Sequence, residues 1–160
     1  MATRSNIVLI KVNKGGELVA ESSYCHWDGY PDYNGLILET VFKKTKDIQK
    51  LVNRGEMSSI SRHGKVDKMV DRGPKEIDSL ANNPSLKQYA KEKMEKWGTE
   101  YLYYWVDKSA AAYVPKSWVE KWRVVDFYHP DIQEQRLRLL FSEDQLKNPF
   151  KKDHYGYKGG

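Results

Sequence analysis

The run Cys25-His26-Trp27-Asp28-Gly29-Tyr30-Pro31 gathers the side chains that are best equipped for chemistry into one short stretch of the chain. It holds a thiol, an imidazole, a carboxylate and two large aromatic rings beside a glycine and a proline. Functional side chains tend to collect on loops that rigid elements hold in place. Because this run lies between a predicted strand and a predicted helix, we expect the first candidate site here.

Two catalytic arrangements can be built from these residue types. A nucleophile pair of Cys25 and His26 is disfavoured, because neighbours on an extended segment point to opposite faces. A metal site could use His26 and Asp28, which are two residues apart and share a face, but it needs at least one more ligand. The candidates for that ligand are His63 and Asp71, which come later in the chain.

The same run also permits a recognition site or a purely structural turn. For recognition, His26 and Asp28 offer hydrogen bonds, and the flat rings of Trp27 and Tyr30 could stack on a base. In a structural turn, Asp28 and Gly29 would make the bend, and Trp27 would fill the core. Both interpretations stay open at the level of the sequence.

Residues 57–83 form the longest stretch without a regular pattern, and they contain Arg62-His63 and Asp71-Arg72-Gly73. The planar guanidinium of arginine can bind a phosphate or carboxylate through two hydrogen bonds. Folded over the loop His26–Tyr30, the side chains of Arg62, His63 and Arg72 would make a cation-lined pocket with aromatic walls, suited to a nucleotide. A solvated loop with local ion pairs is the alternative, and no glycine-rich phosphate loop supports the nucleotide.

Two other segments have a composition that occurs in nucleic-acid-binding proteins. The first is a basic stretch, which consists of Lys43, Lys44, Lys46, Lys50 and Arg54. It favours a solvated helix face or contact with nucleic acid. The second is the aromatic segment 101–105, for which core packing is favoured over base stacking because it contains no Lys or Arg.

The apolar pattern predicts where most elements lie. We expect a hairpin of strands 7–12 and 18–24, helices at 36–42, 45–52 and 84–97, a strand 99–106 that turns into 112–114, a further strand 122–127 and a last helix 132–146. The predicted fold class is therefore α+β, with a mainly antiparallel sheet, built from the N-terminal hairpin and a late aromatic hairpin, and helices packed on one face.

The composition is that of a single folded domain, which we place at residues 1–147, followed by a flexible tail at 148–160. One cysteine excludes an intramolecular disulfide and a multi-cysteine zinc site. A net charge of +5 is compatible with an anionic partner without requiring one. No apolar run is long enough to cross a bilayer, and neither the sequence nor its motifs indicate a cofactor.

The opening residues 1–7 and the segment Tyr24–Pro31 together resemble small accessory proteins that tailed bacteriophages encode. Weaker points of resemblance are Asn34-Gly35 before a helix, Gly55-Glu56-Met57-Ser58, Asp71-Arg72-Gly73 and the strand that begins Glu100-Tyr101. The resemblance covers about residues 1–115, so residues 116–147 form an extension that could carry a partner-specific surface. It implies a context, the cytoplasm of an infected bacterium, and no catalytic residues.

This resemblance implies that the protein acts by binding and counters a host process such as antiviral defence. The leading hypothesis is capture of a nucleotide-like or other anionic ligand by His26, Trp27, Asp28, Tyr30, Arg62, His63 and Arg72. The alternative is an adaptor or inhibitor that binds a host protein or nucleic acid through the basic helices and the extension. A small hydrolase or nuclease that uses His26, Asp28 and His63 is less favoured. Exposed aromatic residues on the late strands could also support a homo-oligomer.

Overall fold

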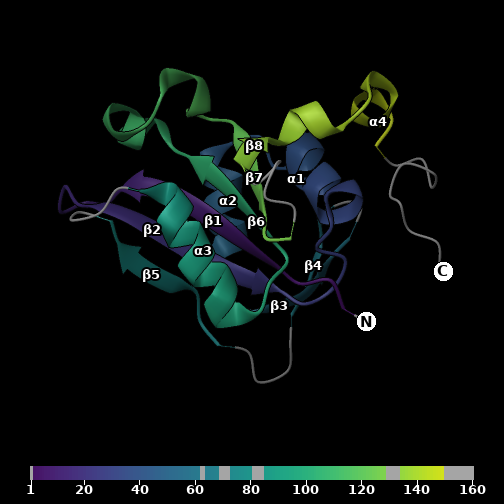
Figure 1. Cartoon of the computed structure of the whole chain (residues 1–160), viewed down its shortest axis with the longest axis horizontal. Coiled ribbons are helices and arrows are strands. Elements are labelled where there is room, and N and C mark those ends of the chain that lie inside the picture. Colours follow the sequence, from purple (N-terminus) through teal and green to yellow (C-terminus); the bar gives the residue numbers. More distant parts are fainter. Residues whose placement is uncertain (1, 62–63, 69–72, 81–84, 129–133, 150–160) are drawn as a thin grey trace.

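A mixed sheet of eight strands forms the centre of the protein (Figure 1). The computed structural model describes residues 2–61, 64–68, 73–80, 85–128 and 134–149. The strands are β1 (Ser5–Val12), β2 (Leu18–Cys25), β3 (Met57–Ile60), β4 (Val66–Lys68), β5 (Glu76–Ser79), β6 (Tyr101–Val106), β7 (Trp122–Asp126) and β8 (Glu134–Arg136). They follow the spatial order β4-β3-β2-β1-β6-β7-β8, and β5 pairs with β2 outside this series.

The N-terminal hairpin is confirmed, since β1 and β2 pair antiparallel along their whole length. The other neighbour of β1 is β6, which runs parallel to it from Ser5 opposite Tyr101 to Ile10 opposite Val106. The sheet is therefore mixed: among the described strands, five pairings are antiparallel, and two, β1 with β6 and β2 with β3, are parallel. The connection between β1 and β6, residues 13–100, is long enough for a parallel pair, which a two-residue hairpin turn could not join.

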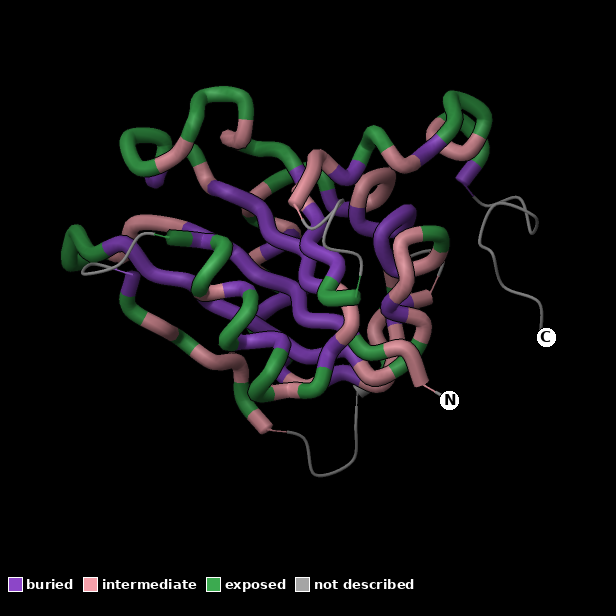
Figure 2. The backbone as a smooth tube through the Cα atoms, in the orientation of Figure 1, coloured by how far each residue is buried: buried purple, intermediate pink, exposed green. Residues whose placement is uncertain are grey.

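Helices cover both faces of the sheet, so the prediction that they pack on one face is wrong. Helices α1 (Leu36–Val41) and α2 (Thr45–Val52) share one hydrophobic cluster with Ile7 and Leu9 of β1. Helix α3 (Leu86–Trp97) shares the other cluster with Val8 and Ile10. The continuous apolar run of β1 is the sequence sign of a strand that is buried on both sides, and Figure 2 shows this strand buried at the centre.

The late aromatic strand is confirmed as β6, but its predicted partner is wrong. Residues Lys108–Tyr113 form a 3₁₀ helix, capped by the Asp107 side chain, which accepts a hydrogen bond from the backbone of Ser109. The antiparallel partner of β6 is β7, for which Tyr103 faces Val124. Aromatic residues of β6 pack in the two cores, as predicted, and Tyr103 and Trp105 belong to the α1–α2 side.

The predicted last helix is replaced by three short elements within its described residues. These are β8, a 3₁₀ helix η5 (Leu137–Leu140) and helix α4 (Glu143–Lys147). Ser142 caps α4 with a capping box to Gln145, which explains why the helix begins only there. Strand β7 buries Trp122 and Val124 in the main core, so the extension is integral to the sheet. Of the predicted tail, residues 150–160 lie outside the described part of the chain.

The stretch predicted to be irregular contains the three short strands β3, β4 and β5. Each has only three or four residues, and their apolar residues do not form a run. Helix α3 begins two residues later than the predicted Asn83-Pro84 start, because Ser85 is its N-cap and accepts a hydrogen bond from Gln88 N. Among the described residues, no helix has the length and apolar character needed to cross a membrane.

Candidate functional site

The loop that follows β2 is fixed from two sides by its backbone. The amide of Trp27 donates to the carbonyl of Ser58 on β3, with an N···O distance of 2.9 Å. The amide of Gly29 donates to the carbonyl of Thr3 in the N-terminal segment at 2.8 Å. Backbone hydrogen bonds to β3 and to the N-terminal segment therefore hold the loop in place, as is common for loops that carry functional side chains.

Asp28 and Gly29 make the bend of this loop. Asp28 has a φ of 58°, in the left-handed region that asparagine and aspartate tolerate better than most residues. A Cβ on Gly29 would lie 2.8 Å from the Cβ of Ser5, so only glycine fits. The buried side chain of Asn34 completes the turn, because its amide donates to the carbonyl of Trp27 at 3.2 Å. The bend therefore has the structural role that the turn interpretation gave to it.

Cys25 lies in the hydrophobic core and is completely buried. Burial raises the pKa of the Cys25 thiol to about 12, although the Asn34 amide, 3.4 Å from Sγ, acts in the opposite direction. A protonated, inaccessible thiol is a poor nucleophile. The site therefore offers no cysteine chemistry in this state.

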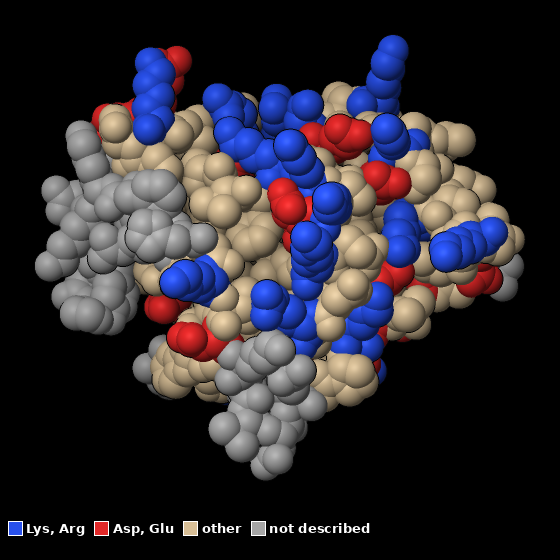
Figure 3. All heavy atoms as spheres, turned by 180° about the vertical axis from the view of Figure 1, so that it is seen from behind, with Lys and Arg blue, Asp and Glu red and all other residues tan. Residues whose placement is uncertain are grey.

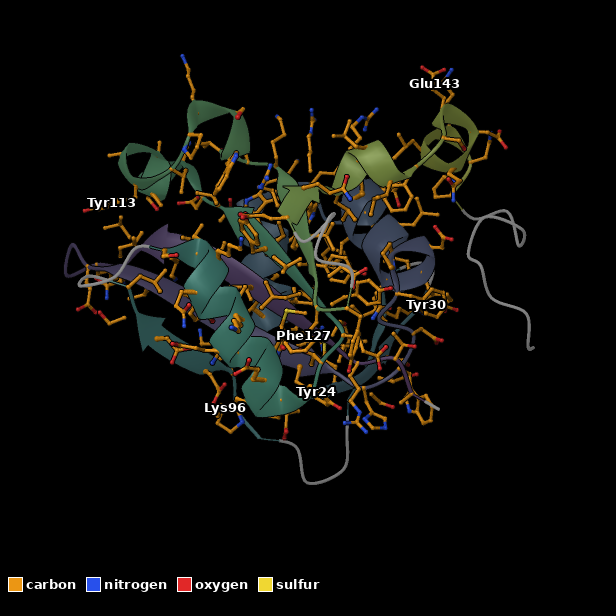
Figure 4. The ribbon with its side chains drawn as sticks, in the orientation of Figure 1. Tyr24, Tyr30, Lys96, Tyr113, Phe127 and Glu143 are labelled. Carbon is orange, nitrogen blue, oxygen red and sulfur yellow. The ribbon has the colours of Figure 1, made fainter. Side chains whose placement is uncertain are left out.

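His26 and Trp27 belong to a row of aromatic rings at the end of β2. Nδ1 of His26 lies 2.8 Å from the Tyr24 hydroxyl, and the His26 ring meets Trp27 edge to face at 4.8 Å. Tyr24 in turn stacks on Trp97, the last residue of α3, with centroids 5.0 Å apart. Figure 4 shows Tyr24 beside this end of α3.

Trp27 is 45% exposed, so the expectation that it fills the core is wrong. Its ring is fixed by the edge contact with His26 on one side, while nearly half of its surface remains open to solvent. A fixed, exposed tryptophan can stack on a planar ligand at little entropic cost. The recognition interpretation of Trp27 is therefore retained.

Tyr30 lines a pocket of about 370 Å³ that also contains Tyr101, Asp32 and Asp126. No Lys or Arg of the described chain lines this pocket. Burial raises the pKa of Tyr101, and the nearby carboxylates of Asp126, Glu100 and Asp32 raise it further. The local potential is thus negative, which disfavours an anionic ligand at Tyr30. Figure 4 shows Tyr30 beside helix α1.

The three predicted cationic residues Arg62, His63 and Arg72 lie outside the described residues, as does Asp71. Their described flanks are ordered: Gly64 N donates to the carbonyl of Ser61 at 2.8 Å, and Glu56 N donates to the carbonyl of Gly73 at 3.1 Å. The closure of this stretch over the loop stays a prediction. Within the described chain, no three His, Cys, Asp or Glu side chains are grouped for a metal ion.

A second candidate site is the basic face, which we define by the exposed cations of α2 and its flanks together with the three cations of the extension that lie near Glu39. Its described members are Lys43, Lys44, Lys46, Lys50, Arg54, Lys121, Arg136 and Arg138. Figure 3 looks at the molecule from the α2 side and shows many Lys and Arg side chains over the middle of this face, with some Asp and Glu side chains among them. The fold therefore brings the basic stretch and the extension together.

The upper part of the basic face contains a shallow pocket of about 200 Å³. Its lining residues are Glu39, Lys43, Trp105, Glu120, Lys121, Trp122, Arg136 and Arg138. Sequence analysis did not identify Lys121, Arg136 and Arg138, since it placed the last two on a long helix. Their only sequence signal was their charge, and their position follows from the pairing of β7 with β6 and β8.

Comparisons of the chain with models of protein families, with curated proteins and with solved structures found no match.

Proposed function

We propose that the chain is a non-enzymatic binding protein that docks on the phosphate backbone of a nucleic acid through its basic face. The observation that supports this proposal is the gathering of cations on one side of the molecule (Figure 3), where Lys43, Lys121, Arg136 and Arg138 line one pocket. Lysine and arginine that neutralise backbone phosphates release condensed counterions, and this release drives binding regardless of sequence. In an infected bacterium, such a protein would counter a host process such as antiviral defence.

Helix α2 presents its charges in a way that suits such a partner. Its buried residues Ile48, Leu51 and Val52 fix the orientation of the helix on the sheet. Lys46 and Lys50 are one turn apart and both exposed, so they lie side by side on the outer surface. Like charges at this spacing cost the helix stability, and an anionic partner would relieve their repulsion.

The proposal is tested by fluorescence anisotropy with a labelled DNA duplex of mixed sequence, at salt concentrations between about 50 and 200 mM. The double variant Lys46→Gln/Lys50→Gln should bind more weakly. The slope of log K against log salt should fall by about 1 for each lysine that contacts a phosphate.

Helix α3 provides a matched control on the opposite side of the sheet. Lys87 and Lys91 are also exposed and one turn apart, so Lys87→Gln/Lys91→Gln removes the same charge. This control should bind the duplex as the unchanged protein does. Equal losses in the two double variants, or no binding at any salt concentration, would refute the proposal.

Capture of a nucleotide-like ligand by the loop is the second candidate, and one observation favours it. The amide of His26 donates to the carbonyl of Met57 at 3.0 Å, so the strand that leads toward Arg62 runs beside the loop that holds Trp27. Calorimetry with cyclic and linear nucleotides tests this candidate. Binding that is lost in both Trp27→Ala and Arg72→Ala supports it, whereas the absence of binding to every nucleotide refutes it.

A further inference from the structure

We propose that the pocket of the basic face is an anchor site for a single phosphate group, held by Arg136, Arg138 and Lys43. This inference deepens the proposed function, on which it rests, because it names the position where one backbone phosphate would be bound. The other cations of the basic face would then act through longer-range attraction. The ligand class is a phosphate ester, either in a nucleic acid or in a free nucleotide.

The pocket is built on a rigid floor of two tryptophans. Trp105 of β6 and Trp122 of β7 meet edge to face with their centroids 5.5 Å apart. Trp105 Nε1 donates to the Thr45 hydroxyl at 2.9 Å, and Trp122 Nε1 donates to the carbonyl of Phe42 at 2.8 Å. These two bonds fix the segment between α1 and α2, and therefore the backbone that carries Lys43, on the sheet.

The charges of the pocket come from segments that are far apart in the sequence. Lys43 follows α1, Lys121 precedes β7, Arg136 ends β8 and Arg138 lies in η5. The lining residues include these four cations and two acids, Glu39 and Glu120, which leaves an excess of two positive charges. A terminal phosphate dianion would balance this excess fully, and a backbone phosphodiester, which carries a single negative charge, would balance half of it.

Two observations indicate that these cations lack close partners within the protein. Nε of Arg136 is buried and has no hydrogen-bond partner among the described residues. Burial raises the pKa of Glu39. The cations Arg138, Arg136 and Lys43 lower this pKa only through longer-range attraction. Guanidinium groups bind phosphate oxygens in a planar, two-bond arrangement, so a phosphate in the pocket would provide acceptors for the terminal guanidinium nitrogens of Arg138 and Arg136.

The test is a titration of the whole chain with inorganic orthophosphate, followed by NMR through the indole N–H signals of Trp105 and Trp122. Saturable shifts of these signals are expected. Arg136→Gln and Arg138→Gln should each weaken phosphate binding about tenfold, as loss of a charge-assisted hydrogen bond does. Because Arg138 is exposed, its variant tests the site even where replacement of the partly buried Arg136 disturbs folding. Glu39→Gln should tighten binding, since it removes a competing negative charge.

The variant Lys50→Gln separates this inference from the proposed function. It should weaken binding to the duplex and leave the orthophosphate affinity unchanged. Orthophosphate binding that depends on Arg138 without any binding to the duplex would support the pocket and refute nucleic-acid docking. Duplex binding with no orthophosphate shifts, or with shifts equal in Arg138→Gln and the unchanged protein, would refute the pocket alone.

The source of the phosphate is distinguished by the choice of competitor. A dinucleotide with one phosphodiester should displace orthophosphate if the site binds a nucleic-acid backbone. If only a nucleoside monophosphate displaces it, the site binds a terminal phosphate and the ligand is a free nucleotide.

Discussion

Glu76 on β5 and Glu39 on α1 are both glutamates surrounded by cations, and they differ in how closely those cations approach. Glu76 is bonded directly to Lys93 at 2.7 Å, to Lys96 at 2.5 Å and to Nε1 of Trp97 at 2.8 Å. Burial alone would raise the pKa of Glu76, yet these contacts lower it to about 2. No ion pair within 4.0 Å joins Glu39 to another described residue, and burial keeps its pKa above the ordinary value.

This difference separates cations that stabilise the fold from cations that remain available. Lys93 and Lys96 are engaged by Glu76 and tie α3 to β5, the short strand beside β2. Lys11 and Lys75 are engaged in the same way by Glu21, at 2.8 and 2.5 Å. Within the described chain, the basic residues near Glu39 make no such contacts, so their charges remain available to the partner that we propose for the basic face.

The largest expected effect is a loss of stability when the ion pairs of Glu76 with Lys93 and Lys96 are disrupted. The side chain of Lys93 is only 5% exposed and pairs with both Glu76 and Asp78 at 2.7 Å. Lys93→Met keeps most of the volume but leaves the two carboxylates without their shared partner, so it should lower the free energy of unfolding by about 3 kcal/mol. Denaturant unfolding measures this loss.

The matched control for this variant is Lys91→Met, at an exposed position on the same helix. It should change the free energy of unfolding by less than about 0.5 kcal/mol. A similar small change for Lys93→Met would mean that the direct contacts of Glu76 do not stabilise the fold. The cations around Glu76 would then not differ from those around Glu39.

The parts of the fold that the sequence predicts are those with strong local patterns. The hairpin has Asn13 and two glycines between apolar runs, and Asn13 accepts hydrogen bonds from Gly16 and Glu17 in the turn. Helix α3 has helical periodicity and ends at Gly98, whose φ of 65° suits a glycine. In these segments local propensity and tertiary packing favour the same structure.

The features that the sequence does not predict depend on contacts between distant segments. Strand β3 has only four residues, so its apolar pattern is too short to predict a strand. It is placed in the sheet by a single backbone pair with β2, Met57 with Cys25. Trp27 is exposed and directly precedes the bend at Asp28 and Gly29, a bend that depends on contacts with the distant residues Thr3 and Ser5. Arg138 lies near Glu39 because β7 and β8 are strands of the same sheet, and this pairing has no local signal in the sequence.

A smaller effect is expected in the pH dependence of stability, with opposite signs for the two glutamates. The folded-state pKa of Glu76 is about 2, below its ordinary value of 4.5. Its contribution to stability is therefore present above pH 4.5 and is lost as the pH falls toward 2. Glu76→Gln should destabilise the protein at pH 7 by about 1 kcal/mol, allowing for solvent screening of this partly exposed group, and the difference should shrink in acid.

Glu39→Gln should behave in the opposite way. Since the folded-state pKa of Glu39 lies above 4.5, ionisation opposes folding as the pH rises through that value. The variant should be more stable than the unchanged protein at pH 7, by roughly 0.5 kcal/mol, and equally stable at pH 3. Urea unfolding at both pH values distinguishes the signs. Destabilisation by both variants at pH 7 would place Glu39 in a direct ion pair and contradict the comparison.

The smallest effect is expected when one cation near Glu39 is removed. The positive charge of Arg138 lowers the pKa of Glu39 through space, against the dominant effect of burial. Arg138→Gln should therefore raise this pKa further, by a small amount because one exposed charge acts at longer range and is screened by solvent. NMR titration of the Glu39 side-chain carboxyl measures the change, and Lys96→Gln is the control because its partner is Glu76. An unchanged Glu39 pKa in Arg138→Gln would mean that solvent screens the pocket fully, and the cations there would act no differently from isolated surface charges.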